Sequence, residues 1–199
     1  KLGLSLPDIR DYFNDTTQLE DQIDRLIVLK NQLDQCIAQL RLRQAEESSQ
    51  KVYQVTLPEF KAFCRDFSNS DLAEKTVQLR YTYIDALKKF PADNENRMCI
   101  QVSLDSDLNG TYIIPVQADA SEENIRHFPQ VAAICIYYRG AYENFPEVHA
   151  RLLQYALEHN MTPHGYFRNI YMEGPPTHGA NKNAYVTQIA LPIKFIEIK

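Results

Sequence analysis

Tyrosine is the residue type in this chain with the clearest capacity to form a binding site. The 199 residues include 12 tyrosines and no tryptophan. A tyrosine ring offers a face for stacking, and its hydroxyl can hydrogen-bond to water or to a ligand. Many of the tyrosines fall in segments with the pattern of strands, among them Tyr112, Tyr137, Tyr138, Tyr166, Tyr171 and Tyr185. Together they could line a cleft, or each could be a half-buried strand residue with its hydroxyl at the margin of a sheet.

The cysteines and histidines predict neither a metal centre nor a nucleophilic site. The four cysteines are widely separated, lie in apolar patterns and form no C-x-x-C pair: Cys36, Cys64, Cys99 and Cys135. Buried, reduced thiols of a cytoplasmic protein are therefore expected. The five histidines include no H-E-x-x-H motif, and no Ser-His-Asp or Cys-His arrangement is apparent. The sequence thus predicts no metal, no cofactor and no enzymatic activity.

The overall charge argues against a strong nucleic-acid contact within this chain. It carries 21 Lys and Arg against 26 Asp and Glu, which gives a net charge of −5 and an isoelectric point of about 5.5. A protein that grips phosphates needs a basic surplus, and this chain has none. No apolar run approaches the roughly 18 residues of a membrane-spanning helix, so no membrane partner is expected.

The elements that must position these residues begin with two helical segments. Ser5, Pro7 and Asp8 fit the first turn of a short helix. From 15 to 46, leucines recur every seven residues at Leu19 and onward, which predicts a long amphipathic helix. We expect its apolar seam to pair with a second copy of the chain, in a parallel or antiparallel arrangement. The alternative is an ordinary amphipathic helix that lies on its own domain.

After a polar stretch at 45–50 the pattern changes from helical periodicity to alternation. The order strand, helix, strand, strand then occurs twice. Strands are predicted at 51–58, 60–67, 98–104, 111–119, 131–140, 164–173 and 184–195, and helices at 70–90 and 144–160. This order predicts an α+β fold with one antiparallel sheet, both helices on one face, and the other face polar or concave.

Spacing within the two helices predicts which sides are buried and how one helix begins. The second helix is expected to open with Asn144 and Glu147 as a capping box, with Phe145, Val148 and Leu152 inward. The first is expected to bury one side: Leu72, Thr76, Leu79, Tyr83, Leu87 and Phe90.

Several of these segments resemble parts of one family. LGLSLPDIRDYF (2–13) resembles the end of the winged helix-turn-helix of MerR-family transcription regulators. YYRGAYENFPEVHARLLQYALEHN (137–160) and YVTQIALPI (185–193) resemble the GyrI-like effector-binding domain of multidrug-sensing members. The resemblance implies a remnant of the DNA-binding domain at 1–14, a dimerisation coiled coil at 15–46 and a duplicated βαββ sensor at 50–199.

The resemblance also implies a function. Such a regulator is a cytoplasmic homodimer that binds a bulky apolar or aromatic molecule, often a lipophilic cation, in a cleft between the two sensor halves. It couples this binding to promoter DNA, which it would contact through a region ahead of this chain. The candidate ligand-binding residues are Tyr112, Tyr138, Tyr142, Tyr166, Tyr171 and Gln188. The ligand, the promoter and the choice between activation and repression stay open.

Gln188 is the departure from the family pattern. The last strand of GyrI-like domains usually carries a glutamate four residues before the terminal proline, and Gln188 stands there instead. A carboxamide cannot balance a buried cation. Three explanations stay open. The ligands are neutral or weakly polar; Glu143 or Glu173 supplies the negative charge; or Gln188 is an engineered replacement. We expect a broad range of apolar ligands that depends less on positive charge.

Two other functions compete with the regulator. Some GyrI-like domains resemble hydrolases of small electrophilic ligands that use a glutamate, but the carboxamide of Gln188 can act neither as base nor as nucleophile. A protein-interaction module is the third alternative, and it would leave apolar strands exposed for a partner.

Overall fold

The computed structural model describes residues 19–30, 33, 34, 37, 51–68, 70–119, 122–174 and 181–194. They fall into two compact units, Lys1–Ala45 and Glu46–Lys199. The predicted segment at 1–14 lies outside the described residues.

In the first unit, all the described residues between 19 and 37 are helical. Its large apolar side chains are exposed: Leu19, Ile23, Leu26, Leu33 and Ile37 are between 38% and 55% accessible. Lys30 and Asp34 form an ion pair of 2.7 Å one helical turn apart. The apolar seam is therefore present on a helix and has no cover within the described part of the chain.

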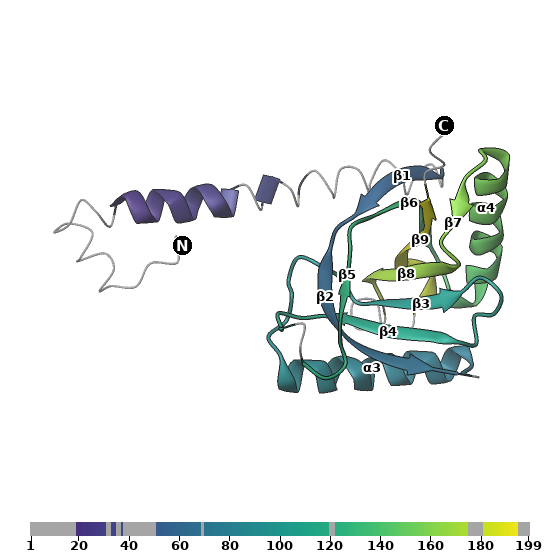
Figure 1. Ribbon diagram of the computed structural model, residues 1–199, viewed down its shortest axis with the longest axis horizontal. Coiled ribbons are helices and arrows are strands. Elements are labelled where there is room, and N and C mark those ends of the chain that lie inside the picture. Colours follow the sequence, from purple (N-terminus) through teal and green to yellow (C-terminus); the bar gives the residue numbers. More distant parts are fainter. Residues whose placement is uncertain are drawn as a thin grey trace. The chain divides into compact units, whose positions relative to one another are not determined.

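The second unit has the α+β composition that the sequence predicts (Figure 1). Its elements in chain order are β1 (Tyr53–Leu57), β2 (Phe60–Phe67), α3 (Leu72–Lys89), β3 (Cys99–Ser103), β4 (Gly110–Pro115), β5 (Ile125–Phe128), β6 (Val131–Arg139), a 3₁₀ turn (Tyr142–Asn144), α4 (Phe145–Glu158), β7 (Thr162–Pro163), β8 (Tyr166–Glu173), a second 3₁₀ turn (Lys182–Ala184) and β9 (Val186–Lys194). The short strands β5 and β7 are additions that the sequence analysis did not predict as separate elements.

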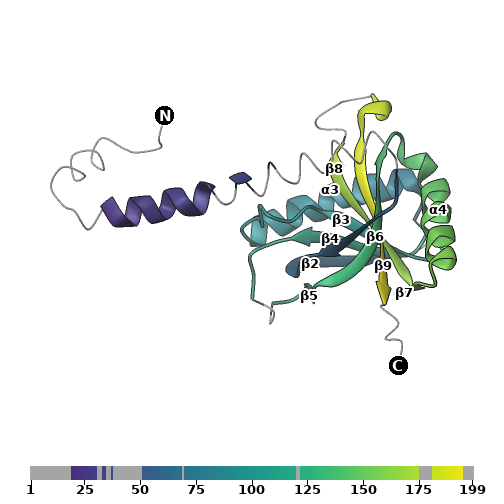
Figure 2. The same ribbon diagram turned by 90° about the horizontal axis from the view of Figure 1, so that it is seen from above.

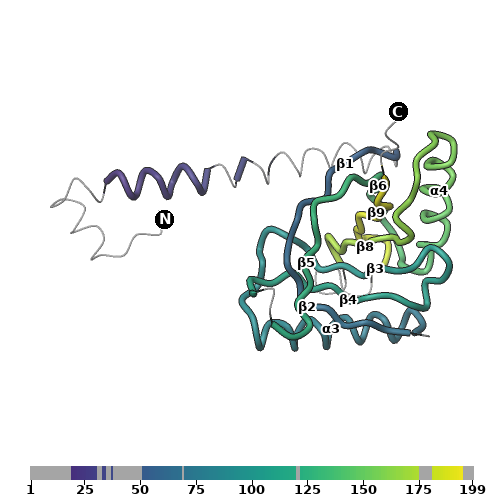
Figure 3. Tube along the Cα trace, viewed as in Figure 1, coloured from purple at the N-terminus to yellow at the C-terminus, as the bar shows by residue number. Residues whose placement is uncertain are grey.

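All strand pairs of the sheet are antiparallel, in the order β1-β6-β9-β8-β3-β4-β2-β5, and β7 pairs with β9. The chain path in Figure 3 shows how early and late segments meet, since β1 lies beside β6 and β6 beside β9. Figure 2 shows α3 and α4 outside the curled sheet. Helix α3 contacts β2 and β4, whereas α4 contacts β6, β7 and β9.

The two faces of the sheet hold different cores. The main core lies between the sheet and the helices and includes Ile134 and Ile136 of β6, Ile189 and Leu191 of β9, and Leu152 of α4. Because strand side chains alternate between faces, the neighbouring residues form separate clusters on the opposite face. One cluster contains Leu57, Ala133, Cys135 and Ala190, and another contains Ala62, Cys64, Cys99 and Ile113.

The predicted buried side of α3 is only partly right, since Leu79 is buried and Phe90 packs against the main core but the other predicted residues do not form the buried side. The helix buries Lys75, Leu79, Thr82 and Ala86, and Tyr83 is 40% exposed. The Lys75 ammonium donates to the Asp107 carbonyl at 2.8 Å and lies 3.3 Å from its carboxylate, which compensates its buried charge.

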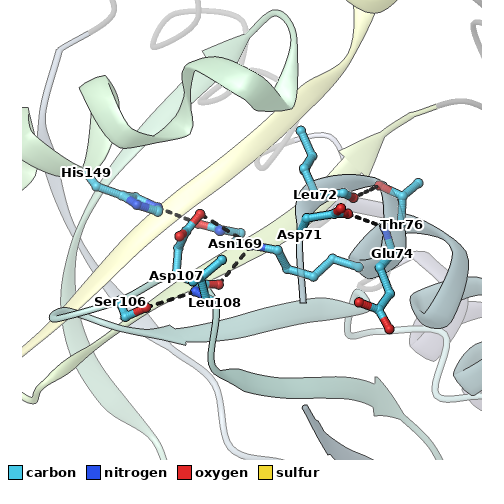
Figure 4. Close-up of polar contacts among 10 residues, drawn as sticks. Asp71, Leu72, Glu74, Thr76, Ser106, Asp107, Leu108, His149 and Asn169 are labelled. Carbon is cyan, nitrogen blue, oxygen red and sulfur yellow. Dashed lines mark hydrogen bonds and ion pairs between the residues drawn. The ribbon is translucent and has the colours of Figure 1, made fainter. Parts of the chain in front are cut away.

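The two helices also begin differently. The Asp71 side chain caps α3 by accepting from the Glu74 amide at 2.9 Å (Figure 4). The capping box predicted for α4 is wrong, because the Asn144 side chain makes no capping bond there. It donates instead to the Tyr138 hydroxyl at 3.0 Å.

A buried histidine joins α4 to the sheet. Nε2 of His149 donates to Oδ1 of Asn169 at 3.0 Å, and Figure 4 shows the two side chains pointing at each other. The imidazole stacks on Phe167 with ring centres 3.9 Å apart. Burial lowers the pKa of His149, while the bond to Asn169 and the Asp107 carboxylate oppose this shift and Lys75 reinforces it.

This environment predicts a pH-dependent stability. Because the folded pKa of His149 lies below its unfolded value of about 6.5, the unfolded chain takes up the proton first as the pH falls. The free energy of unfolding should therefore decrease through that range, by at most about 1.4 kcal/mol per pH unit from this group. His149→Gln keeps a donor to Asn169 but cannot titrate, so urea unfolding between pH 7.5 and 5.5 should show a shallower slope for it. Equal slopes for both proteins would contradict the assignment.

Candidate ligand-binding site

The sheet separates the six predicted ligand-binding residues into two groups. Tyr138 and Tyr171 contact the main core on the helix side, as does Tyr142 from the turn before α4. Tyr112 is a fully buried member of that core. The remaining two residues, Tyr166 and Gln188, project from the opposite face of the sheet, on strands β8 and β9.

The helix-side group is an aromatic cluster around Tyr142. Its ring centre lies 5.3 Å from Tyr171, 5.2 Å from Tyr185 and 5.3 Å from Phe145. Burial, reinforced by the neighbouring Tyr185, raises the pKa of Tyr142 to about 12. A Cβ built at Gly174 would lie 2.8 Å from the Tyr142 hydroxyl. Close packing therefore holds this tyrosine in place.

Tyr112 and Tyr138 also pack tightly. The Tyr112 ring lies 4.6 Å from Phe67, and burial raises its pKa. The Tyr138 and Phe145 rings pack edge to face, with their centres 6.0 Å apart. Gly140 has a φ of +148°, and a Cβ there would lie 2.4 Å from the Tyr138 hydroxyl, so glycine is required at this turn.

The opposite face of the sheet is concave. Strands β8 and β5 are four interstrand steps apart, or about 19 Å in a flat sheet. Nevertheless the guanidinium carbon of Arg168 in β8 lies only 5.1 Å from the centre of the Phe128 ring in β5. Such a contact requires the sheet to curl toward this side, as Figures 1 and 2 show. We call it the concave face.

Gln188 lies on the concave face beside two tyrosines. Its Nε2 donates to the Tyr53 hydroxyl at 2.8 Å, and the Tyr53 ring stacks on Tyr137 with centres 5.4 Å apart. In the ladder Gln188 lies opposite Tyr137 on one side and Ile170 on the other. Burial is the main cause of the raised pKa of Tyr53. The carboxamide is thus one polar group within an aromatic and apolar wall.

Arg168 is the residue on this face that the sequence analysis missed. Arg168 is only 2% exposed. Its Nε and Nη1 are buried, and no described residue accepts a hydrogen bond from either nitrogen. Its guanidinium carbon lies 5.1 Å from the Phe128 ring and 5.7 Å from the Phe60 and Tyr166 rings. The one signal in the sequence was that Arg168 follows Tyr166 by two residues in a predicted strand, so both side chains project from the same face of the sheet.

The carboxylates considered as alternatives to Gln188 differ in position. Glu143 forms an exposed ion pair with Lys182, which lowers its pKa. Glu173 ends β8 opposite Val186, after an irregularity in the ladder. Asp66 is on the concave face, but the Arg126 guanidinium holds it with two bonds of 2.9 and 2.6 Å.

The thiols confirm the expectation of buried, unpaired cysteines for the described residues Cys64, Cys99 and Cys135. Burial raises the pKa of Cys64 and of Cys99 to about 12, even though Arg168 opposes the shift. These thiols are therefore protonated and poor nucleophiles. Cys36 lies outside the described residues. Over the described ranges, no group of three or more histidine, cysteine, aspartate or glutamate side chains could hold a metal ion.

An open hollow of about 530 Å³ lies elsewhere, against the outer side of α4. Its lining consists of Val52, Ala150, Arg151, Gln154, Tyr155 and Glu158, none of which is a predicted site residue. Among the described helices, none is long and apolar enough to cross a membrane.

Comparison with solved structures shows where this fold occurs. The crystal structure of the EcmrR C-terminal domain aligns with a TM-score of 0.63 and 14% identity over 73% of this chain and 98% of that one. The EcmrR–DNA complex aligns with a TM-score of 0.64 and 14% identity over 98% and 79%. SAV2435 bound to tetraphenylphosphonium aligns with a TM-score of 0.50 and 14% identity over 72% and 94%. No protein-family model and no curated protein sequence matches the chain.

Gln188 generates a prediction about ligand charge. Three probes share one ring system and differ in charge: naphthalene-2-carboxamidine (cationic), naphthalene-2-carboxamide (neutral) and naphthalene-2-carboxylate (anionic). The cation should bind the wild-type chain no more than tenfold tighter than the neutral amide, a difference of about 1.4 kcal/mol, because the Gln188 carboxamide cannot offset its charge. Gln188→Glu should increase that ratio, measured by isothermal titration calorimetry. A wild-type preference for the cation well above tenfold would refute the expectation.

Proposed function

We propose that this chain is the dimerisation and effector-sensing region of a ligand-responsive transcription regulator. It binds bulky apolar or aromatic small molecules and couples this binding to promoter DNA. The observation that carries the proposal is the alignment of 98% of the chain with EcmrR, a MerR-family regulator, in its DNA complex. A shared fold alone does not establish a function, so the site must support it as well.

The strand order supports a GyrI-like internal duplication of the sensor. In the first half the strands lie in the order β2-β4-β3, and in the second half in the order β6-β9-β8. Each half thus places its first strand beside its last, with a helix following the first strand, and the halves meet where β3 pairs with β8. A sheet built from two such halves has one face under the helices, which leaves the opposite, concave face as the candidate for ligand binding.

The concave face supplies the groups that an aromatic ligand needs. Tyr53 and Tyr137 form a stacked pair beside Gln188, and Phe60 and Phe128 form another pair with centres 5.0 Å apart. Stacked rings attract flat apolar molecules, and a few polar groups fix their orientation. SAV2435, a protein of similar fold, has been solved bound to tetraphenylphosphonium, which is a bulky aromatic cation.

No enzymatic step is part of this proposal. The amide of Gln188 cannot act as a base, and the pKa values of Cys64 and Cys99 are too high for thiolate chemistry near neutral pH.

Homodimerisation through the seam of the predicted 15–46 helix is testable with one substitution. Leu26 lies in the seam and is 52% exposed. Leu26→Asp would put a charge into the dimer interface, so the dissociation constant of the dimer should rise at least tenfold in sedimentation equilibrium. Asp24→Ser, on the same helix outside the seam, is the matched control and should leave the dimer intact. An unchanged dimer with Leu26→Asp would show that the chain pairs through another surface.

The regulatory role is tested with the full-length protein, including whatever its gene encodes ahead of Lys1. A DNA site is first selected by the binding of the protein to fragments of its own genome. The affinity of the protein for this DNA site and the rate of in vitro transcription from it are then measured with and without the naphthalene probe that binds best. Saturating probe should change at least one of the two, because ligand binding shifts the balance between DNA-bound conformations. If neither quantity changes with a probe that demonstrably binds, the regulator proposal is refuted.

A further inference from the structure

We propose that the concave face recognises an organic anion, specifically the carboxylate of an aromatic or apolar acid, and that Arg168 is the residue that binds it. The inference rests on the proposed function in one respect, since both place the ligand on the concave face. It goes further by assigning the ligand's charge and the residue that selects it.

Arg168 carries a buried charge that the described residues do not neutralise. A guanidinium stays protonated in proteins, so this group is a cation in the folded state. The residue is 2% exposed, and Nε and Nη1 have no acceptor among the described residues. A buried charge is tolerated when a partner compensates it, and an unpaired one is destabilising. An anionic ligand would supply the missing acceptors.

The surroundings of Arg168 compensate its charge only in part. Three aromatic rings, from Phe60, Phe128 and Tyr166, lie within 5.7 Å of the guanidinium carbon. Ring faces attract the cation, but they accept at most weak hydrogen bonds from N–H groups and supply no oxygen acceptor. The same rings offer an apolar surface to a ligand whose carboxylate meets the guanidinium, and arginine binds carboxylates through paired hydrogen bonds.

The carboxylate on the same face is already committed to other groups. Register places Asp66 opposite Thr111, Thr111 opposite Gln101, and Gln101 opposite Arg168, which puts these side chains in one row across the sheet. Asp66 accepts two bonds from Arg126 and one of 2.7 Å from the Thr111 hydroxyl. Within the described residues no carboxylate lies within ion-pair distance of Arg168, so a ligand does not have to displace one.

Gln188, the other polar group of the concave face considered as a ligand contact, is compatible with an anionic ligand. Where a glutamate would favour cations, Gln188 is neutral and hydrogen-bonds to Tyr53. A buried arginine together with a neutral glutamine makes the local field positive, which favours anions and opposes lipophilic cations.

The experiment compares the naphthalene carboxylate with the isosteric carboxamide on the full chain by isothermal titration calorimetry. The wild type should bind the carboxylate at least tenfold tighter than the carboxamide. Arg168→Met should abolish this preference for the carboxylate while the carboxamide still binds. Arg168→Lys should keep part of the preference, because lysine keeps the positive charge but lacks the planar guanidinium that bonds a carboxylate in pairs.

Arg65→Met is the matched control: Arg65 lies on β2, pairs with Asp85 and projects toward α3. It should leave the preference unchanged.

Thermal unfolding without ligand accompanies each titration. Arg168→Met should unfold at a temperature no lower than the wild type, since it replaces an unpaired buried charge by an apolar side chain of similar length. Equal affinities for carboxylate and carboxamide, or a preference that survives Arg168→Met, would overturn the anion site while leaving the ligand sensor intact. Failure of all three naphthalene probes to bind at millimolar concentration would overturn the anion site, and the DNA experiment would then decide the regulator proposal separately.

Discussion

Curling of a single antiparallel sheet is the constraint on which the rest of this structure depends. Strand side chains alternate, so every residue of the sheet faces either the helices or the concave side. The helix side absorbs the large aliphatic residues such as Ile134, Ile189 and Leu191 into the main core. The concave side holds Leu57, Ile113, smaller apolar residues, aromatic rings and a few polar groups, and curling brings groups together from strands that are far apart in the sheet.

Three charged side chains of the second unit differ in how they are partnered. Lys75 is neutralised by the carbonyl and carboxylate of Asp107 in the β3–β4 loop. Arg126 forms a two-bonded pair with Asp66 near the surface. Arg168 has three aromatic rings near its guanidinium, and its Nε and Nη1 have no acceptor among the described residues. The first two arrangements are complete within the chain, and the contrast with them is what singles out Arg168.

Several tyrosines that the sequence analysis considered for ligand binding are packed into the main core instead. On the helix side, Tyr138, Tyr142 and Tyr171 fill the corner where the 3₁₀ turn, α4 and the end of β8 meet. On the concave side, Tyr53 and Tyr137 stack beside Gln188, and Tyr166 contacts Arg168. The concave face therefore carries a different set of tyrosines from the candidate ligand-binding residues named from the sequence, and Tyr166 is the tyrosine common to both sets.

Sequence periodicity by itself determined the order of the longer strands and of helices α3 and α4, the inward positions Phe145, Val148 and Leu152 of α4, and the apolar seam that begins at Leu19. These features follow from local spacing, because alternation and the helical repeat are properties of neighbouring residues. Tertiary structure alone decided the buried side of α3, the Asn144 bond to Tyr138, and the division of the tyrosines between faces. It alone placed Arg168 among Phe60, Phe128 and Tyr166. Those outcomes depend on which strands pair and how far the sheet curls, and the contacts that accompany both join residues far apart in the chain, such as Gln188 and Tyr53, which are 135 positions apart.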